Sequence, residues 1–579
     1  MTLTQFYPFD RRSVWLLCGM GVLHGLVGAA VGLSVDEAHY LLYALHPALS
    51  YFDHPPLVGW VQWPGVALEL PTVLLRVLPG ALWLATAAGV YQLAESFQEN
   101  AGAGFWALVA LALAPLLHVL GIGLLPDSLL IFFTVALMWQ TRVLMQASAL
   151  QRPWPWMVLG LLLGLAGLSK YTALLPALAV GVCLVAAHGV RVLRSPWAWL
   201  AVLLAMAMVV PVVVWNAHNA WVSFTYQAQH GAGSVWSARH VAQFVVVQAL
   251  AFGPLLWWGL GGFKDEVEQG KPRVAILRVF FYVPWVVMAL MAGGGSSLPH
   301  WTAPAWVALA PFAGLALARG ASKAHAKLQA ISVKIVVWVQ ALLSATLLGL
   351  MVSAGQPFLA AGFNDVRVGS NPFADLHGWE QASKRAKVLA LQHGLKSLSV
   401  QNWTLASRLA WYARPMPVHV LEDRFDQFDF WAGDLPQGAD TLLVDWSHMA
   451  YATPLGAHGF NTCTLLETQN VVHAGQALAA SVGMGPAFCG DFSQRPAVVA
   501  LVGTSALLGD QPCLRPFADG GLDWSVSFGK WLGRFRHHLA FVGAPAAFDV
   551  GLAVRSALCH CVCEAGKRFD CEPPPGGRN

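Results

Sequence analysis

Two acidic residues and one lysine have the types and spacing that proton transfer and anion binding require. Asp36 and Asp127 each follow an apolar run, and Lys170 follows a third run in a region with few other cations. A carboxylate can accept the proton of a hydroxyl that attacks an electrophile, and an ammonium group can stabilise the charge that develops on a leaving group. These residues predict a site that handles a proton and an anion.

Other polar and aromatic residues gather in the same connecting segments. The first segment contains Ser34-Val35-Asp36-Glu37-Ala38-His39-Tyr40 and then Tyr51-Phe52-Asp53-His54-Pro55-Pro56-Leu57. Later segments contain Pro126-Asp127, Ser169-Lys170-Tyr171-Thr172, Trp215-Asn216 and Pro299-His300-Trp301. The candidate substrate contacts beside the two acids and the lysine are Glu37, Tyr40, Asp53, His54, Tyr171 and His300.

Each residue taken alone has a simpler interpretation. Asp36 and Asp127 could cap the helices that follow them, and Lys170 could extend its ammonium group toward lipid headgroups. His54 and His300 could be interfacial histidines with satisfied hydrogen bonds. The combination of two acids after apolar runs with a cation on the same face favours a functional site.

The composition places the chain in a membrane. Of its 579 residues, 56% are hydrophobic and 11% are charged, whereas about a quarter of the residues of a soluble domain are charged. This composition excludes a soluble globular protein. The net charge of +4 is small for this length and gives no general attraction for nucleic acid.

Apolar runs long enough to cross a bilayer as helices recur as far as residue 353. The sequence predicts eleven spans, near residues 13–33, 71–93, 104–121, 128–146, 155–169, 171–188, 197–215, 241–262, 276–293, 301–318 and 332–353. Arg11 and Arg12 precede the first run as they would in a signal peptide, but no small-residue cleavage site follows. We therefore expect the first run to remain as a span.

The distribution of Lys and Arg predicts the orientation. With the N-terminus in the cytoplasm, most of these residues before residue 353 lie at cytoplasmic ends of spans, as the positive-inside rule requires. The exceptions are Lys170 and Arg239 on the outer side and Arg76 inside a span. The candidate site and everything after residue 353 are then periplasmic.

The sequence predicts three regions: a transmembrane domain over residues 1–353, a small periplasmic α/β domain over 354–492, and a tail of unknown function over 493–579. Helical patterns at 378–391 and 404–412 alternate in the second region with strand patterns at 398–400, 418–421 and 441–444. Cys463 and Cys489 could form a disulfide in an oxidising compartment.

The order of these motifs resembles that of the family 39 membrane glycosyltransferases of the GT-C class. The resemblance is carried by Asp36-Glu37, Tyr40, the segment from Tyr51 to Leu57 and four later motifs, over about residues 13–490. These four motifs read Leu125-Pro126-Asp127-Ser128-Leu129-Leu130, Gly167-Leu168-Ser169-Lys170-Tyr171-Thr172-Ala173, Trp215-Asn216 and Leu298-Pro299-His300-Trp301. The family includes enzymes that modify lipid A and protein O-mannosyltransferases.

The resemblance implies transfer of a sugar from a polyprenyl-phosphate donor, with undecaprenyl phosphate as the expected carrier lipid. It implies an inverting enzyme of the bacterial inner membrane that acts on the periplasmic face. Asp36 would be the general base, Asp127 its partner, and Lys170 with His54 would bind the lipid phosphate. Lipid A or the lipopolysaccharide core is the first acceptor expected, and a protein is the second.

Two questions stay open at the level of sequence. The lipid A aminoarabinose transferases carry Glu-Lys-Pro where this chain has Asp53-His54-Pro55, and a histidine is a weaker, pH-dependent cation. Asp53 could instead join His300 around a divalent metal ion. A transporter of lipid-linked sugars is the alternative class, but such proteins tend to have internal repeats and polar residues at mid-membrane depth.

Overall fold

The computed structural model describes residues 6–97, 102–232, 235–261, 272–295, 297–320, 326–355, 373–422, 424–445, 459–467, 472–473, 476–477 and 485–492. The chain divides into two compact units, residues 1–523 and 524–579, and all described residues belong to the first. The predicted tail over 493–579 lies outside the described residues.

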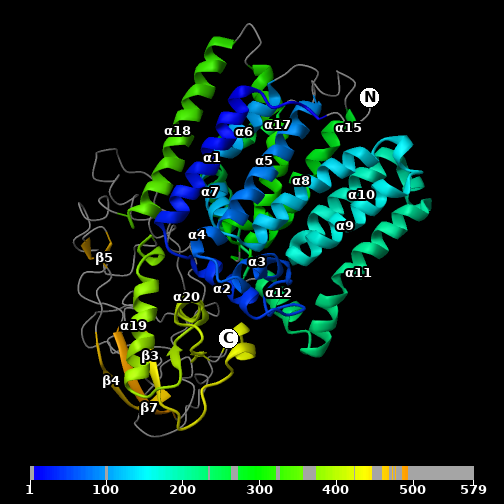
Figure 1. Ribbon diagram of the computed structural model, residues 1–579. Coiled ribbons are helices and arrows are strands. Elements are labelled where there is room, and N and C mark those ends of the chain that lie inside the picture. Colours follow the sequence, from blue (N-terminus) through cyan, green and yellow to red (C-terminus); the bar gives the residue numbers. More distant parts are fainter. Residues whose placement is uncertain are drawn as a thin grey trace, which may run out of the picture. The chain divides into compact units, whose positions relative to one another are not determined.

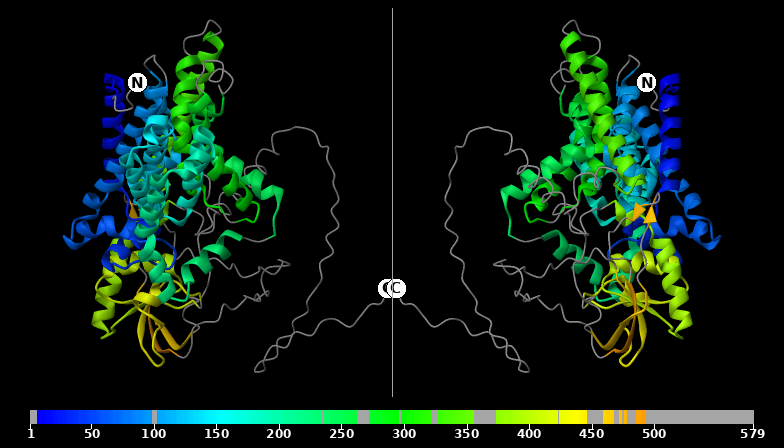
Figure 2. Two further views of the ribbon diagram at one scale, coloured as in Figure 1. Left: turned by 90° about the vertical axis from the view of Figure 1, so that its right-hand side faces the viewer. Right: turned by 90° about the vertical axis from the view of Figure 1, so that its left-hand side faces the viewer.

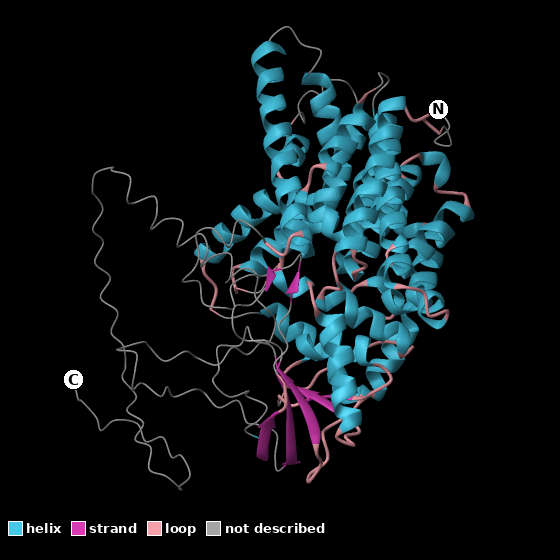
Figure 3. Cartoon of the chain, turned by 60° about the vertical axis from the view of Figure 1, so that its left-hand side comes forward, coloured by secondary structure: helices cyan, strands magenta, loops and turns pink. Residues whose placement is uncertain are grey.

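Every regular element that the structure describes before residue 353 is a helix (Figures 1 and 3). Long helices stand beside one another with roughly aligned axes (Figure 2). The α-helices are α1 (Arg11–Ala30), α2 (Val35–Leu45), α3 (Leu57–Ala67), α4 (Thr72–Leu75), α5 (Val77–Phe97), α6 (Ala103–Ala112), α7 (Pro115–Ile122), α8 (Pro126–Leu144), α9 (Pro153–Ser169), α10 (Leu174–His188), α11 (Pro196–His218), α12 (Val222–Ala232), α13 (Ala238–Phe252), α15 (Pro272–Ala275), α16 (Val279–Ala292), α17 (Ala303–Gly320) and α18 (Ala326–Val352).

Short 3-10 helices connect several of these elements. They are η1 (Ala147–Ala149), η2 (Tyr171–Ala173), η3 (Gly189–Arg194), η4 (Pro254–Leu260), η5 (Ile276–Arg278) and η6 (Pro299–Thr302).

Seven described helices are long and apolar enough to span a bilayer, and up to nine spans result if each of two bent helix pairs counts as one. The two remaining predicted runs, near 155–169 and 276–293, coincide with shorter apolar helices. The predicted class, a multi-pass helical membrane protein, is confirmed. The number of eleven spans stays a prediction, because these two helices fall short of the length of a full span.

The spans differ in how much of their surface the protein covers. In the apolar central part of the helical stretch Pro299–Arg319, 83% of the residues are buried, and in that of Pro126–Leu144, 72%, whereas in Pro196–His218 only 11% are. The first two are therefore interior helices, and the third presents its apolar side chains outward, as lipid contact requires. Asp127 and His300 both begin interior helices.

Small residues bring α9 and α11 close together, and they lie side by side in Figure 1. A methyl group at Gly160 would lie 2.7 Å from the carbonyl oxygen of Ala201, and one at Gly164 would lie 2.5 Å from the sulfur of Met208. Glycines at this spacing let helix backbones approach in a membrane. Their contact fixes the axis of α9, which ends directly before Lys170.

The described residues from 373 onward contain helices and a mixed sheet (Figure 3). The sheet has the order β2-β1-β3-β7-β4, with β1 parallel to β2 and β3, and β7 antiparallel to β3 and β4. The elements are η7 (Ala374–Leu376), α19 (Trp379–Gln392), β1 (Leu398–Val400), α20 (Trp403–Ala413), β2 (Val418–Val420), α21 (Gln427–Trp431), β3 (Thr441–Asp445), β4 (Phe460–Leu465), β5 (Val472–His473), β6 (Gln476–Ala477) and β7 (Gly485–Phe492).

Helices α19 and α20 and strands β1 to β3 coincide with the helical and strand patterns predicted there. Cys463 is disulfide-bonded, and the register of β4 and β7 places it opposite Cys489. The predicted pairing of these two cysteines fits that register. The limits of the three predicted domains stay a prediction.

One hydrophobic core joins this sheet region to the first outer segment, residues 34–57. Leu41 and Leu42 of α2 share a buried cluster with Trp379 of α19, Leu409 of α20 and Leu442 of β3. Helix α2, which carries Asp36, therefore packs against the sheet region.

Candidate active site

Asp127 and Lys170 form a buried ion pair in the interior of the helical region. The ammonium nitrogen of Lys170 lies 2.7 Å from each carboxylate oxygen of Asp127, and both residues are 5% exposed or less. Nε2 of His300 lies 3.7 Å from Oδ2 of Asp127. The structure thus brings together three candidate residues that are widely separated in the sequence.

The simpler interpretations of these residues do not fit the structure. The cap of α2 is Ser34, whose hydroxyl accepts from the backbone N–H of Glu37, so Asp36 does not cap that helix. No side chain at the cap position of α8 bonds to its first turn, and Asp127 lies inside that turn. The ammonium group of Lys170 points to Asp127 rather than to a headgroup region. The two acids lie where a helix dipole favours negative charge.

Asp36 lies in a buried environment near the other acids of the candidate site. Its carboxylate makes no hydrogen bond or ion pair with any residue that the structure describes. Burial raises the pKa of Asp36 to about 6, an effect that His39 opposes and that Asp53 and Asp127 reinforce. A base whose pKa lies near the working pH can accept a proton and release it again.

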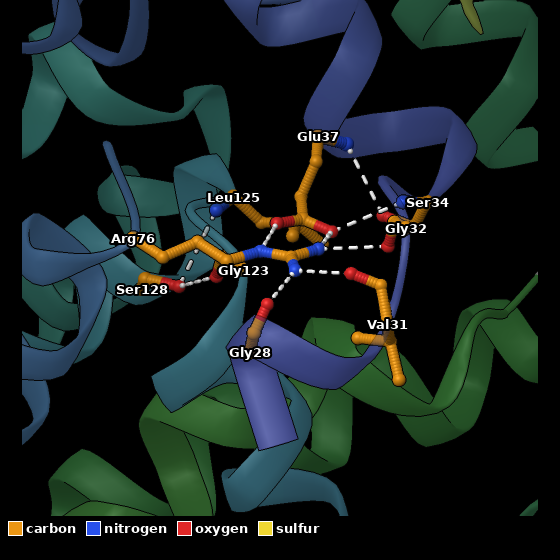
Figure 4. A network of polar contacts seen from close by, with 9 residues as sticks. All are labelled: Gly28, Val31, Gly32, Ser34, Glu37, Arg76, Gly123, Leu125 and Ser128. Carbon is orange, nitrogen blue, oxygen red and sulfur yellow. Dashed lines mark hydrogen bonds and ion pairs between the residues drawn. The ribbon is translucent and has the colours of Figure 1, made fainter. Parts of the chain in front are cut away.

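Glu37 is held by an arginine that sequence reasoning did not assign to the site. Arg76 donates from Nε to Oε1 of Glu37 over 2.8 Å and from Nη2 to Oε2 over 2.9 Å. It also donates to the backbone carbonyls of Gly28, Val31 and Gly32 (Figure 4). Burial opposes ionisation of Glu37, but the guanidinium of Arg76 holds its pKa below the usual range.

This network positions both acids. Figure 4 shows Gly123 and Ser128 beside the Glu37–Arg76 pair, and a methyl group at Gly123 would lie 2.7 Å from Cδ of Glu37. The start of α8 therefore packs directly against the first turn of α2. Because Asp36 and Asp127 lie in these two turns, the contact at Gly123 fixes one relative to the other.

Asp53 is ionised and held by two side chains of α2. It accepts a hydrogen bond from the hydroxyl of Tyr43, and Nε2 of His39 lies 3.8 Å from its Oδ1. Burial opposes its ionisation, but His39, His54 and Tyr43 hold the pKa of Asp53 well below the usual range. His39 also shares a hydrogen bond of 3.1 Å with Ser407 of α20, so it joins the site to the sheet region.

His54 and Tyr171 are buried polar side chains of the site. Nδ1 of His54 has no hydrogen bond in the described part of the chain, whereas the buried hydroxyl of Tyr171 lies near the polar side chains of Ser50, Ser223 and Asn216. Burial lowers the pKa of His54 to about 4, so its ring is neutral at pH 7. Tyr40 packs its ring 5.6 Å from that of His54, and burial raises the pKa of Tyr40 well above its ordinary value. Neutral donors of this kind suit hydroxyl groups or phosphate oxygens.

No group of three or more His, Cys, Asp or Glu side chains converges as a metal site among the described residues. Asp53 contacts Tyr43 and His39, whereas His300 lies beside Asp127. These contacts do not fit the metal site considered for Asp53 and His300. No step proposed for the site therefore runs through a metal ion.

Comparison with known proteins identifies the relatives of the chain. Residues 53–215 match the family model described as dolichyl-phosphate-mannose-protein mannosyltransferase. Lipid A galacturonosyltransferase RgtD of Rhizobium johnstonii is 24% identical over 288 residues, which cover 48% of this chain and 59% of that protein. Both matches are to membrane glycosyltransferases, and the chain is similar to them over these residues. The aligned part spans less than two thirds of RgtD, so this match alone does not establish the activity of the chain.

The fold of the chain matches that of ArnT from Cupriavidus metallidurans. The crystal structures of ArnT in the apo state and bound to undecaprenyl phosphate each give a TM-score of 0.54, with 16% and 17% sequence identity. Each match covers 82% of this chain and 97% of ArnT. The GT-C fold inferred from the motif order is confirmed.

Sequence reasoning did not assign Arg76, His39 or Tyr43 to the site. Arg76 was recognisable, because an arginine inside an apolar run is costly unless it is paired. The pairing of His39 and Tyr43 with Asp53 depends on the return of the segment over residues 46–57 onto α2. No spacing in the sequence encodes that return.

Proposed function

We propose that the chain is an inverting glycosyltransferase that moves a sugar from undecaprenyl phosphate, or a similar polyprenyl phosphate, to an acceptor on the periplasmic face of the inner membrane. The observation that carries the proposal is the convergence of Asp36, whose carboxylate has no partner among the described residues, with the buried Asp127–Lys170 pair. The relation to RgtD and the likeness of the fold to ArnT bound to undecaprenyl phosphate support it.

In the proposed reaction an acceptor hydroxyl attacks the anomeric carbon of the sugar. The new bond forms from the acceptor oxygen to that carbon as the bond from carbon to the phosphate oxygen breaks. Asp36 takes the hydroxyl proton, and the electron pair of the broken bond leaves with the polyprenyl phosphate. Attack opposite to the leaving group inverts the configuration.

Lys170 and Asp127 act on the leaving phosphate in this proposal. An ammonium group has three N–H donors, and Asp127 engages Lys170 through both carboxylate oxygens. One donor remains for a phosphate oxygen, and Asp127 holds the ammonium in place. His54 would donate a hydrogen bond as a neutral ring. Tyr40, Asp53, Tyr171 and His300 complete the proposed surroundings of the reacting groups, and Glu37, whose two carboxylate oxygens are engaged by Arg76, supports the turn that carries Asp36.

Lipid A or the lipopolysaccharide core is the acceptor that we favour, because the relative RgtD is named for lipid A. A protein acceptor is the second candidate, since the family model that matches residues 53–215 is described for protein mannosylation. Mass spectrometry of lipid A and of envelope proteins from a strain that lacks the gene would distinguish the two.

The orientation proposed here places the N-terminus in the cytoplasm and the region from residue 373 in the periplasm. The disulfide bond of Cys463 supports that placement, because disulfides persist in the periplasm and are rare in the cytosol. Reporter fusions after residue 319 and after residue 392 would test it. The first should report cytoplasm and the second periplasm.

The direct test of the activity uses purified protein and a labelled polyprenyl-phosphate sugar. Wild-type protein with envelope extract should release polyprenyl phosphate, and Asp36→Asn should lower turnover by about 10²- to 10⁴-fold, the usual contribution of a general base. Full turnover by Asp36→Asn would contradict the role of this residue. A donor that is never consumed with any envelope extract would contradict the enzyme itself.

A further inference from the structure

An arginine of the sheet region contacts α12, which packs against the first outer segment. Arg424 lies between β2 and α21, and its Nη2 donates a hydrogen bond of 3.0 Å to the hydroxyl of Tyr226 on α12. Its guanidinium carbon lies 5.5 Å from the centre of the same ring. The ring of Tyr226 packs 4.7 Å from that of Phe52, the neighbour of Asp53.

The surroundings of Arg424 are built by several contacts between the same elements. The backbone N–H of Phe52 donates to Oε1 of Gln427 over 2.7 Å, and the ring of Phe425 lies 5.8 Å from that of Phe52. The side chain of Gln227 donates to the carbonyl of Asp53 over 2.7 Å. Arg424 is therefore held where the sheet region, α12 and the first outer segment meet.

Arg424 forms no ion pair with a carboxylate in the part of the chain that the structure describes. By contrast, Arg76 is paired with Glu37, and Lys170 is paired with Asp127. Tyr226 takes one of the five N–H donors of the Arg424 guanidinium, so the described contacts leave donors for a ligand.

Three acids share the loop over residues 421–426 with Arg424 in the sequence: Glu422, Asp423 and Asp426. Burial raises the pKa of Glu422 to about 7 and that of Asp426 to about 6. Oδ1 of Asp426 accepts from the backbone N–H of Phe428 over 2.7 Å. The raised pKa values mean that these two carboxyl groups take up a proton more readily than exposed acids do.

We propose that Arg424, oriented by Tyr226, is an anion-binding position that the sheet region adds to the active site, and that its ligand is a phosphate group. The planar guanidinium fork presents parallel N–H donors to two phosphate oxygens in a fixed geometry, which the rotatable donors of an ammonium group do not have. The proposal rests on the proposed function for its two sources of phosphate. These are the phosphate of the polyprenyl donor and a phosphate carried by a glycolipid acceptor.

The test compares Arg424→Ala and Arg424→Lys with the matched control Arg414→Ala in full-length protein. Arg414 belongs to the same region, and its guanidinium lies 3.9 Å from the ring of Trp411, so the control also removes an arginine stacked on an aromatic ring. Binding of undecaprenyl phosphate is measured by calorimetry in detergent, and the KM values for donor and acceptor are measured separately.

We expect Arg424→Ala to weaken one of these interactions by about 10- to 100-fold, the range for hydrogen bonds to a charged group. Arg424→Lys should lose less, and Arg414→Ala should match the wild type. A loss of undecaprenyl phosphate binding assigns Arg424 to the donor, and a rise in the acceptor KM alone assigns it to the acceptor. The proposal is wrong if neither changes by more than about twofold, or if Arg414→Ala loses as much.

Tyr226→Phe provides a check that does not depend on removing the charge. It should raise the same KM as Arg424→Ala by a smaller factor and leave kcat unchanged, because it frees the guanidinium without removing it. A change in kcat alone would contradict the role of Tyr226. Binding of undecaprenyl phosphate needs no transfer, so a wild type that binds the lipid but moves no sugar would refute the proposed function alone.

Discussion

Two buried ion pairs lie at the starts of neighbouring helices, and they differ in how fully their hydrogen bonds are used. All five N–H donors of Arg76 are used, two on Glu37 and three on backbone carbonyls. Glu37 also accepts from the backbone N–H of Ser34. Lys170 has both of its bonds on Asp127, with one donor left over. We call the first pair closed, because all of its N–H donors are used, and the second pair open, because one N–H donor of Lys170 remains for a ligand.

The difference separates structure from function better than burial does, because Glu37, Asp127 and Lys170 are all less than 9% exposed. A closed pair can only hold elements together, and the Arg76–Glu37 pair ties the end of α1 to α2 (Figure 4). An open pair has an N–H donor left for a substrate. Buried polar atoms without a partner among the described residues, such as Nδ1 of His54, can also bind a substrate. Four measurements test this distinction.

The open pair should be needed for catalysis and dispensable for folding. The double variant Asp127→Asn with Lys170→Met removes both charges and leaves neither unpaired, so stability should stay near that of the wild type. Sugar transfer should fall by about 10²- to 10³-fold, the range for losing a group that stabilises developing charge. Thermal unfolding and kcat/KM are measured on one preparation. A double variant that unfolds at wild-type temperature and transfers sugar at wild-type rate would make this pair structural.

The closed pair should behave in the opposite way. Glu37→Gln leaves Arg76 buried without its counter-charge, and breaking a buried pair costs about 3 to 5 kcal/mol. The midpoint of thermal unfolding should fall, while kcat/KM per folded molecule should stay within about threefold of the wild type. Glu380→Gln is the control, because Glu380 pairs with Lys384 on the exposed face of α19, where a pair contributes about 1 kcal/mol or less.

The two acids at the start of α2 should also differ in pH dependence. Because burial raises the pKa of Asp36 to about 6, kcat/KM should fall about tenfold per pH unit below 6 and level off above it. Arg76 lowers the pKa of Glu37, so the fall of kcat/KM below pH 6 should persist in Glu37→Gln and disappear in Asp36→Asn. If the fall persists in Asp36→Asn, the titration of another group causes it.

Stability should depend on the two acids with opposite signs. The raised pKa of Asp36 means that its ionisation opposes folding above pH 6, so Asp36→Asn should raise the unfolding temperature at pH 8. The lowered pKa of Glu37 means that its stabilising effect is present at neutral pH and is lost as the solution becomes more acidic. Unfolding temperatures at pH 8 and pH 5 for the two variants measure both signs.

The sequence predicts the helical membrane fold well because lipid imposes a strong rule on span length and composition. Asp36, Asp127 and Lys170 stand out for the same reason, since charge is rare in this chain. The sequence does not predict which pairs are closed. Glu37 follows Asp36 directly, yet one carboxylate meets Arg76 and the other meets no described partner, a difference that depends on where α5 begins relative to α2.

The contribution of the sheet region is also hidden in the sequence. Arg424 lies about 200 residues after Tyr226, and contacts of α12 and of the loop before α21 with the first outer segment bring the two together. Long-range contacts of this kind follow from packing of whole elements, which no local pattern of residues encodes.

The smallest effect should come from Tyr43, which donates a hydrogen bond to Asp53. Tyr43→Phe removes one of several groups that favour the ionised carboxylate, and His39 remains 3.8 Å away, so the pKa of Asp53 should rise without the group becoming neutral at pH 7. We expect KM to increase by about three- to tenfold, the effect of one hydrogen bond, with kcat nearly constant. Phe428→Leu, a change in a buried ring of the sheet region, is the control for packing. A loss of kcat beyond about 100-fold in Tyr43→Phe would place Tyr43 among the groups that touch the reacting atoms. The residues that contact the substrate would then extend along α2 from Asp36 to Tyr43.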